Sequence, residues 1–199
     1  MRLLAVTCLA AATLVAACST TVNVSESKKV RELRVPPESV TFIWSAAKPP
    51  SYSSLPAMGG MFIGGPSQRE VFQAYPSEFT AFAEALRPQL EAHTELRPAF
   101  VRLPSSHSQE QLDRVLQEVR KRSAVVLMYP EKVTGYCAPG CYAFSVRVNY
   151  LSAQQRRLVW TGVIETPPKN NHHDSFEPVA RTFAQELVKQ LKDQELVPR

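Results

Sequence analysis

Residues 142–150 read Tyr-Ala-Phe-Ser-Val-Arg-Val-Asn-Tyr, an alternation of apolar and mostly polar side chains. Because successive side chains of a strand point to opposite faces of a sheet, this pattern predicts a β-strand with one buried face. Residues 152–156 would turn the chain, and residues 157–165 would return as a second strand. In that second strand we expect one row to hold Leu158, Trp160, Gly162 and Ile164.

Further strands are expected on the amino-terminal side of this hairpin. Residues 40–44 and 99–103 are short and rich in β-branched and aromatic side chains, which favours strands. Residues 124–129 are apolar on both faces, a pattern typical of a strand that is covered on two sides. We expect residues 48–69 to be loop, because prolines and glycines are dense there.

Helical spacing appears in three places. The first helix would start near Ser77 and end or kink near Leu86, because Pro88 cannot donate a hydrogen bond to the preceding turn. Ser108 and Gln111 have the spacing of a capping box, which would open a second helix. A third helix would follow Asp174 or Ser175, with an apolar stripe that runs to Leu191.

Together these elements have the order β-α-β-α-β-β-β-α. This order predicts an α/β (α+β) fold, a single domain in which about three helices pack on a mixed β-sheet. The domain would occupy residues 38–199, a length that supports one hydrophobic core and is short for two.

The first residues have the layout of a secretory signal peptide. Met1 and Arg2 give a positive start, an almost uninterrupted apolar run follows to Val15, and small residues come next. The run is shorter than the roughly 20 residues that a membrane-spanning helix needs. Leu14-Val15-Ala16-Ala17-Cys18 resembles the lipobox of bacterial lipoproteins. The resemblance implies cleavage after residue 17 and attachment of diacylglycerol and fatty acids, such as palmitate, to Cys18.

Lipid on Cys18 would make the membrane a partner of the chain. Several acyl chains hold a protein stably on a bilayer, whereas one chain binds only marginally. Ser19 follows the cysteine, and by the sorting pattern of this class it points to the periplasmic side of the outer membrane. Residues 18–37 are polar, and we interpret them as a lipidated amino terminus and tether.

One proline- and glycine-rich segment carries apolar side chains between two glycine pairs. We expect either that they pack under the edge of the domain or that they contact a partner protein or lipid. These possible contact residues are Met58, Met61, Phe62 and Ile63.

Cys137-Ala138-Pro139-Gly140-Cys141 predicts a disulfide. Pro139-Gly140 favours a type II turn, which would bring the two cysteines close together in the oxidising envelope. The alternative is a metal or small-molecule carrier in which Cys137 and Cys141 act with His172 and His173. Adjacent histidines seldom ligate one ion, so we assign no metal site and expect no cofactor.

Catalytic motifs are not evident, and we expect no enzymatic activity. His93 and His107 lie near polar segments, and we expect both to be solvated. The basic residues are interspersed with acidic ones, and nucleic acid is not an expected partner for an exported chain.

The function that the sequence favours is a non-catalytic binding or assembly factor with a protein partner in the envelope. The element order loosely resembles small periplasmic lipoproteins such as the penicillin-binding-protein activators. It also resembles the amino-terminal module of the Tol-system β-propeller protein. No residue motif supports these resemblances, so they carry no site residues. Contacts could come from the glycine-flanked apolar segment or from polar hairpin residues, namely Arg147, Asn149, Arg156 and Arg157.

Overall fold

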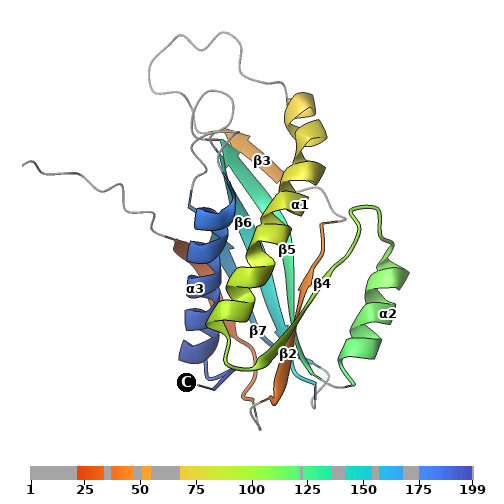
Figure 1. Ribbon diagram of the computed structural model, residues 1–199, viewed down its shortest axis with the longest axis vertical. Coiled ribbons are helices and arrows are strands. Elements are labelled where there is room, and N and C mark those ends of the chain that lie inside the picture. The colour runs from red at the N-terminus through yellow and green to blue at the C-terminus, as the bar shows by residue number, and fades with distance from the viewer. Residues whose placement is uncertain are drawn as a thin grey trace, which may run out of the picture.

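A seven-stranded mixed sheet organises the chain (Figure 1). The structure, a computed structural model, describes residues 22–33, 37–46, 51–54, 68–121, 123–135, 142–153, 157–167 and 175–198. Six strands lie in the order β1-β7-β6-β5-β2-β4, and β3 pairs with β5 beyond the end of β2. The strands are β1 (Asn23–Lys29), β2 (Ser39–Trp44), β3 (Ser51–Ser54), β4 (Arg97–Arg102), β5 (Ala124–Gly135), β6 (Tyr142–Leu151) and β7 (Leu158–Glu165).

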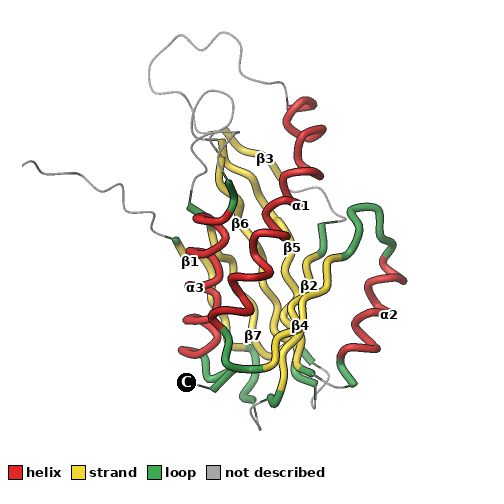
Figure 2. The backbone as a smooth tube through the Cα atoms, viewed as in Figure 1, coloured by secondary structure: helices red, strands yellow, loops and turns green. Residues whose placement is uncertain are grey.

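Helices cover both faces of the sheet (Figure 2). On one face, α1 (Gln68–His93) and α3 (Glu177–Asp193) lie side by side. On the other face, α2 (Gln109–Val119) packs near β5. The predicted α+β class is confirmed, and the expected succession of elements is present with two further strands, β1 and β3.

The larger core lies between the sheet and the pair α1 and α3. Its centre is aromatic: the ring of Phe82 lies 5.4 Å from that of Trp44, 5.7 Å from that of Phe144 and 5.6 Å from that of Phe183. Phe82 and Phe183 come from the apolar faces expected of the first and third helices. Helical periodicity in the sequence therefore identified the faces that are buried.

The hairpin predicted from the 142–150 alternation is present as β6 and β7. Phe144, Val146, Val148 and Tyr150 all lie in the core beneath α1 and α3. The expected row on β7 is wrong at one residue. Consecutive residues Tyr150 and Leu151 pair with Trp160 and Leu158, so Val159 is the extra residue of a β-bulge. The bulge turns Leu158 to the opposite face, where it packs with the cluster beneath α2.

Asn23–Lys29, which the sequence places in a tether, is instead an edge strand. It pairs antiparallel with β7 from Asn23 opposite Glu165 to Lys29 opposite Trp160. Its side chains are mostly exposed, so no apolar pattern marks it. Backbone hydrogen bonds to β7 hold it in the sheet, and the interpretation of residues 18–37 as one continuous tether is corrected.

The region expected to be loop, residues 48–69, contains β3 and the start of α1. The first helix therefore begins at Gln68, well before the expected Ser77, and it continues through Pro88 to His93. Pro88 is exposed. The backbone carbonyl one turn earlier lacks its usual N–H donor, and it can bond to solvent instead. Leu86 and Leu90, which flank it, are buried and hold the helix on the sheet.

The edge strand β4 also contains a proline. Leu103 N donates to Trp44 O, so alternate residues of this strand bond β2 and those between them face the free edge. Pro98 is one of the residues that face the free edge. Its missing N–H therefore costs no bond within the sheet.

Candidate functional site

The site residues predicted from the sequence lie largely outside the described residues. This applies to the lipid attachment residue, the cysteine pair, both histidines of the carrier alternative and the possible contact residues. They are Cys18, Cys137, Cys141, His172, His173, Met58, Met61, Phe62 and Ile63. The predicted contacts that the structure describes are Arg147, Asn149 and Arg157.

The face of the sheet opposite α1 and α3 has two unlike halves. Beneath α2 it is apolar, with Ile43, Val125, Leu127 and Leu151 forming a second, smaller core with Leu116 of the helix. Towards β1 and β7 it is polar, and no described helix lies over this side (Figure 2). We call this half the open face and define it by Glu26, Lys28, Tyr129, Glu131, Arg147, Asn149 and Thr161.

Arg147 is the centre of the open face. Its guanidinium donates to Glu131 Oε1 from Nε at 3.0 Å and from Nη2 at 2.7 Å, and to Glu26 Oε2 from Nη1 at 3.1 Å. The arginine side chain is only 23% exposed, whereas Glu26 is 60% exposed. The hydrogen bond to Glu131 is the main cause that raises the pKa of Arg147, against a smaller opposing effect of burial. The charge of Arg147 is therefore fixed and held in one place.

Two β-bulges accompany these ion pairs. Val24 and Glu26 oppose consecutive residues of β7, and Pro130 and Lys132 oppose consecutive residues of β6. The second bulge contains Glu131 itself, and a bulge redirects the side chains around it. The pair Arg147–Glu26 reaches across β7 at Val163, which stands in register between them. Val163 itself is 4% exposed.

A second chain of hydrogen bonds runs beside the first. Thr161 Oγ1 donates to Asn149 Oδ1 at 2.7 Å, and Asn149 Nδ2 lies 3.4 Å from the Tyr129 hydroxyl. These three residues come from β7, β6 and β5, so the chain crosses the sheet in the same direction as the ion pairs. The open face is thus an ordered polar surface, and its side chains carry both signs of charge.

Sequence reasoning missed a buried pair at the end of β2. Ser45 Oγ lies 3.0 Å from His107 Nε2, and His107 Nδ1 lies 2.6 Å from Pro104 O. A carbonyl only accepts, so Nδ1 carries a proton and donates it to Pro104 O; in a neutral ring with this tautomer, Nε2 would accept from the serine hydroxyl. Each residue is 8% exposed, and the expectation that His107 is solvated is wrong. The pair ties the end of β2 to the connection before α2.

Neither a metal cluster nor a membrane-spanning helix is found in the described part of the chain. No three His, Cys, Asp or Glu side chains gather closely enough there to hold an ion. None of its helices combines the length and the apolar character needed to cross a bilayer.

Solved structures with a similar arrangement share little sequence with this chain. PelC from Paraburkholderia phytofirmans, solved as a dodecamer, is 11% identical, with a TM-score of 0.44 over 86% of this chain and 96% of that one. Protein XCC0632 from Xanthomonas campestris is 10% identical, with a TM-score of 0.37 over 83% and 93%. Lipoprotein GNA1162 from Neisseria meningitidis is 12% identical, with a TM-score of 0.33 over 77% and 99%. No family model matches the sequence, and no curated protein does either.

Proposed function

We propose that this chain is a lipid-anchored accessory protein of the bacterial envelope, which binds a protein partner through its open face and catalyses no reaction itself. The observation that carries the proposal is the ordered network around Arg147 on a part of the sheet that no described helix covers. The expected location is the periplasmic side of the outer membrane.

The anchoring part of this proposal is supported by the amino-terminal sequence. A positive start, an apolar run, small residues and Cys18 occur in the order that lipoprotein processing requires. Multiple acyl chains on one cysteine suffice to hold a domain on a membrane. Ser19, rather than an aspartate, supports sorting to the outer membrane.

The binding part is supported by the open face. Binding costs less entropy when side chains are already held in one conformation, as Arg147 and Asn149 are by their hydrogen bonds. Arginine and tyrosine are also the residue types that contribute most at protein interfaces. The mixture of Glu26, Lys28 and Arg147 favours a partner that presents both charges, and it does not favour a polyanion.

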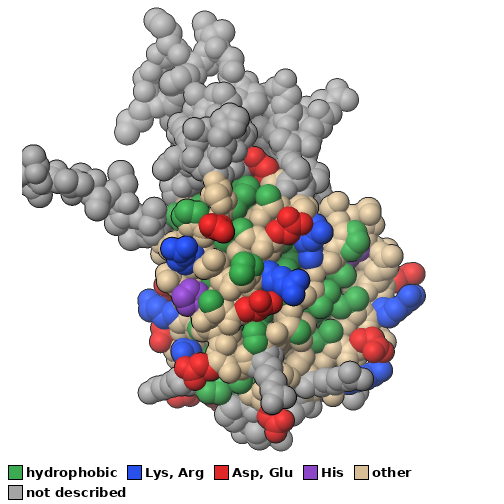
Figure 3. All heavy atoms as spheres, in the orientation of Figure 1, with side chains coloured by type: hydrophobic (Ala, Val, Ile, Leu, Met, Phe, Trp, Pro, Cys, Tyr) green, Lys and Arg blue, Asp and Glu red, His purple; other side chains and the backbone are tan. Residues whose placement is uncertain are grey.

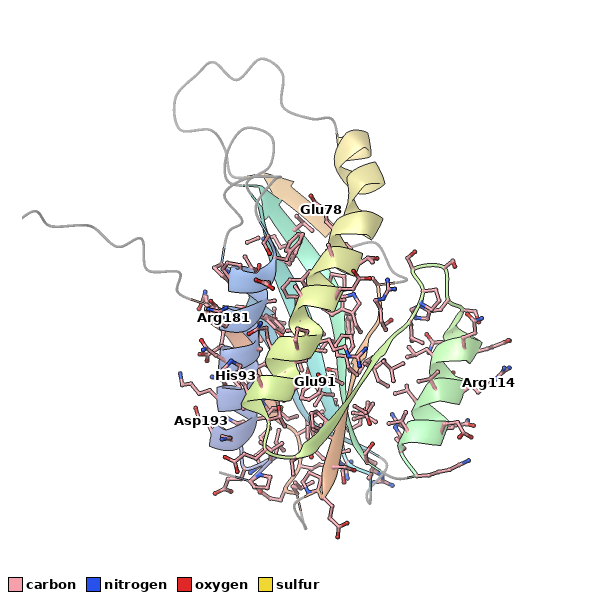
Figure 4. The ribbon with its side chains drawn as sticks, in the orientation of Figure 1. Glu78, Glu91, His93, Arg114, Arg181 and Asp193 are labelled. Carbon is pink, nitrogen blue, oxygen red and sulfur yellow. The ribbon has the colours of Figure 1, made fainter. Side chains whose placement is uncertain are left out.

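Photo-crosslinking in intact cells tests this assignment. A photoreactive phenylalanine analogue at Thr161 would sit within the open face, and the same analogue at the exposed Arg181 would sit on α3 on the opposite side (Figure 4). We expect a discrete crosslinked product from position 161 and none from position 181. Equal products from both positions, or none from either, would contradict the assignment.

Charge reversal provides the matched mutational test. Lys28 and Arg181 are both exposed cations on regular elements, so neither change should alter folding. Lys28→Glu should reduce capture of the crosslinked partner several-fold, and Arg181→Glu should leave it unchanged. The assignment fails if Arg181→Glu has the larger effect.

The apolar segment around Met61 and Phe62 offers a second contact with the partner, and it can be tested separately. Met61→Asp combined with Phe62→Asp should weaken partner capture and leave the melting temperature nearly unchanged. A variant that loses cooperative folding would show instead that these side chains belong to the core.

A further inference from the structure

The strand β1 begins only a few residues after the cysteine that would carry lipid. We infer that the end of the sheet at which β1 begins faces the membrane at close range, so the partner of this end is the lipid surface itself. The inference rests on the proposed lipid attachment at Cys18. It concerns the orientation of the domain and is independent of the open face.

The strand β1 is firmly part of the domain. Val24 packs against the main core, and Trp160 Nε1 donates to Ser27 Oγ at 3.1 Å. Beyond the strand, Val30 N donates to Val159 O at 2.7 Å. Backbone pairing and the Val24 core contact thus fix the start of the strand to the body of the protein, and the indole bond fixes its second half.

The connection to the lipid is therefore short. Residues 19–22 alone separate Cys18 from Asn23. Five peptide steps span at most about 18 Å when fully extended. The acyl chains place Cys18 at the level of the lipid headgroups, so Asn23 lies within about 18 Å of that level.

The neighbouring strands β5 and β6 extend further in the same direction. Asn23 is level with Glu165 and Ser145, and β6 begins three residues earlier at Tyr142, opposite Gly135 of β5. Three residues of strand correspond to about 10 Å. With the tether fully extended along the strands, this end of β5 and β6 stands about 8 Å from the level of Cys18. The start of α1 comes closer still, because Phe79 packs on Phe144 at 5.0 Å and Gln68 lies eleven helical residues, about 16 Å, before Phe79.

The same lengths argue against the opposite orientation. The far end of β1, Lys29, lies six residues from Asn23, about 20 Å along the strand. If that end faced the bilayer, Asn23 would stand beyond the reach of its tether, because the sheet and the turn after Leu151 would lie between. The end of the sheet at Leu151 and Leu158 therefore points away from the membrane.

Two exposed residues mark the two ends of the sheet, one near the membrane and one far from it. Glu177 opens α3 next to Phe176, whose ring stacks on Phe144 at 6.2 Å and so marks the membrane end. Arg157 precedes Leu158 at the far end. Seven residues of strand separate Phe144 from Leu151, which corresponds to about 24 Å.

Energy transfer to acceptor lipids measures this difference. A donor dye is attached through an unnatural amino acid at position 177 or 157 of the full acylated protein, reconstituted into phosphatidylethanolamine–phosphatidylglycerol vesicles. We expect the distance of closest approach to be about 20 Å shorter for position 177. A spacer of twelve glycine and serine residues between Thr21 and Val22 should increase both distances and remove most of the difference.

The outcomes separate the two ideas. Acylation is read independently from the mass of the intact protein, and a chain without lipid contradicts the proposed anchoring and, with it, this orientation. An acylated protein in which both positions are equally distant overturns the orientation alone, because the domain would then lie on its side. A shorter distance for position 157 overturns it as well.

Discussion

At the scale of single residues, sequence patterning identified the buried apolar positions and missed the buried polar ones. Phe144, Val146 and Val148 are fully or almost fully buried, as their alternation predicts. His107 is buried because it pairs with Ser45, which lies 62 positions away in the chain. Such a partner leaves no local signal, so only the folded structure brings the two residues together.

Tyr150 makes the free energy of unfolding decrease at alkaline pH. Burial raises the pKa of its hydroxyl, which donates to Leu196 O at 2.9 Å. The unfolded chain releases the proton near pH 10, whereas the folded chain retains it. Above that pH the unfolded state therefore binds fewer protons, and the free energy of unfolding falls as pH rises.

Tyr150→Phe tests this dependence. We expect the variant to lose about 1–2 kcal/mol at pH 7, because the Leu196 carbonyl loses its donor. Its urea unfolding free energy should then fall less steeply than that of the natural chain between pH 9 and pH 11. Parallel pH profiles would contradict the assignment of the alkaline effect to Tyr150.

Gly162 is required by the indole beside it. A Cβ at this position would lie 2.5 Å from Trp160 Cζ2 and 3.0 Å from Glu26 O. The indole is buried and its nitrogen bonds Ser27, so it cannot move without cost. Gly162→Ala should reduce the free energy of unfolding by about 1–3 kcal/mol.

The control for this variant is Ser25→Ala, on the exposed β1 strand, which should change stability by less than about 0.5 kcal/mol. An unchanged urea midpoint for Gly162→Ala would show that the strands separate easily at this point. Such a result would weaken the evidence that β1 is fixed to the sheet.

At the scale of elements, the clear periodicities predicted well and the polar or short elements did not. The capping box at Ser108 is present, since its hydroxyl accepts from Gln111 N and the Gln111 side chain accepts from Ser108 N. The strands β1 and β3 were missed because polar residues dominate both. Backbone pairing with β7 and β5 creates these strands, and side-chain periodicity does not report it.

Pro88 shows how packing overrides a local preference. In a helix interior proline costs about 3 kcal/mol relative to alanine, yet α1 continues because its buried side chains hold it on the sheet. Pro88→Ala should raise the free energy of unfolding by about 2 kcal/mol, since part of the gain is lost to the greater freedom of the unfolded chain.

Thermal or urea denaturation measures the effect, with Gln185→Ala on the exposed side of α3 as the control. That control should change stability by only a few tenths of a kcal/mol. A decrease in stability for Pro88→Ala would show that the proline ring makes a needed contact.

At the scale of the whole molecule, the class and the element succession followed from the sequence, while the strand order did not. The order β1-β7-β6-β5-β2-β4 depends on two parallel contacts of β2, with β4 and β5, and these join distant segments. The surface on the side of α1 and α3 mixes charges of both signs (Figure 3). The open face could not be predicted from the sequence either, because it is formed only where the four strands β1, β7, β6 and β5 lie side by side.

Anchoring through Cys18 is the claim on which both the location and the membrane orientation depend. Mass spectrometry of the amino-terminal peptide from natively expressed protein tests it most directly. We expect a peptide that begins at residue 18 and carries a diacylglycerol thioether with an acylated amino group. A peptide with a free thiol, or one still joined to residues 1–17, would contradict the account.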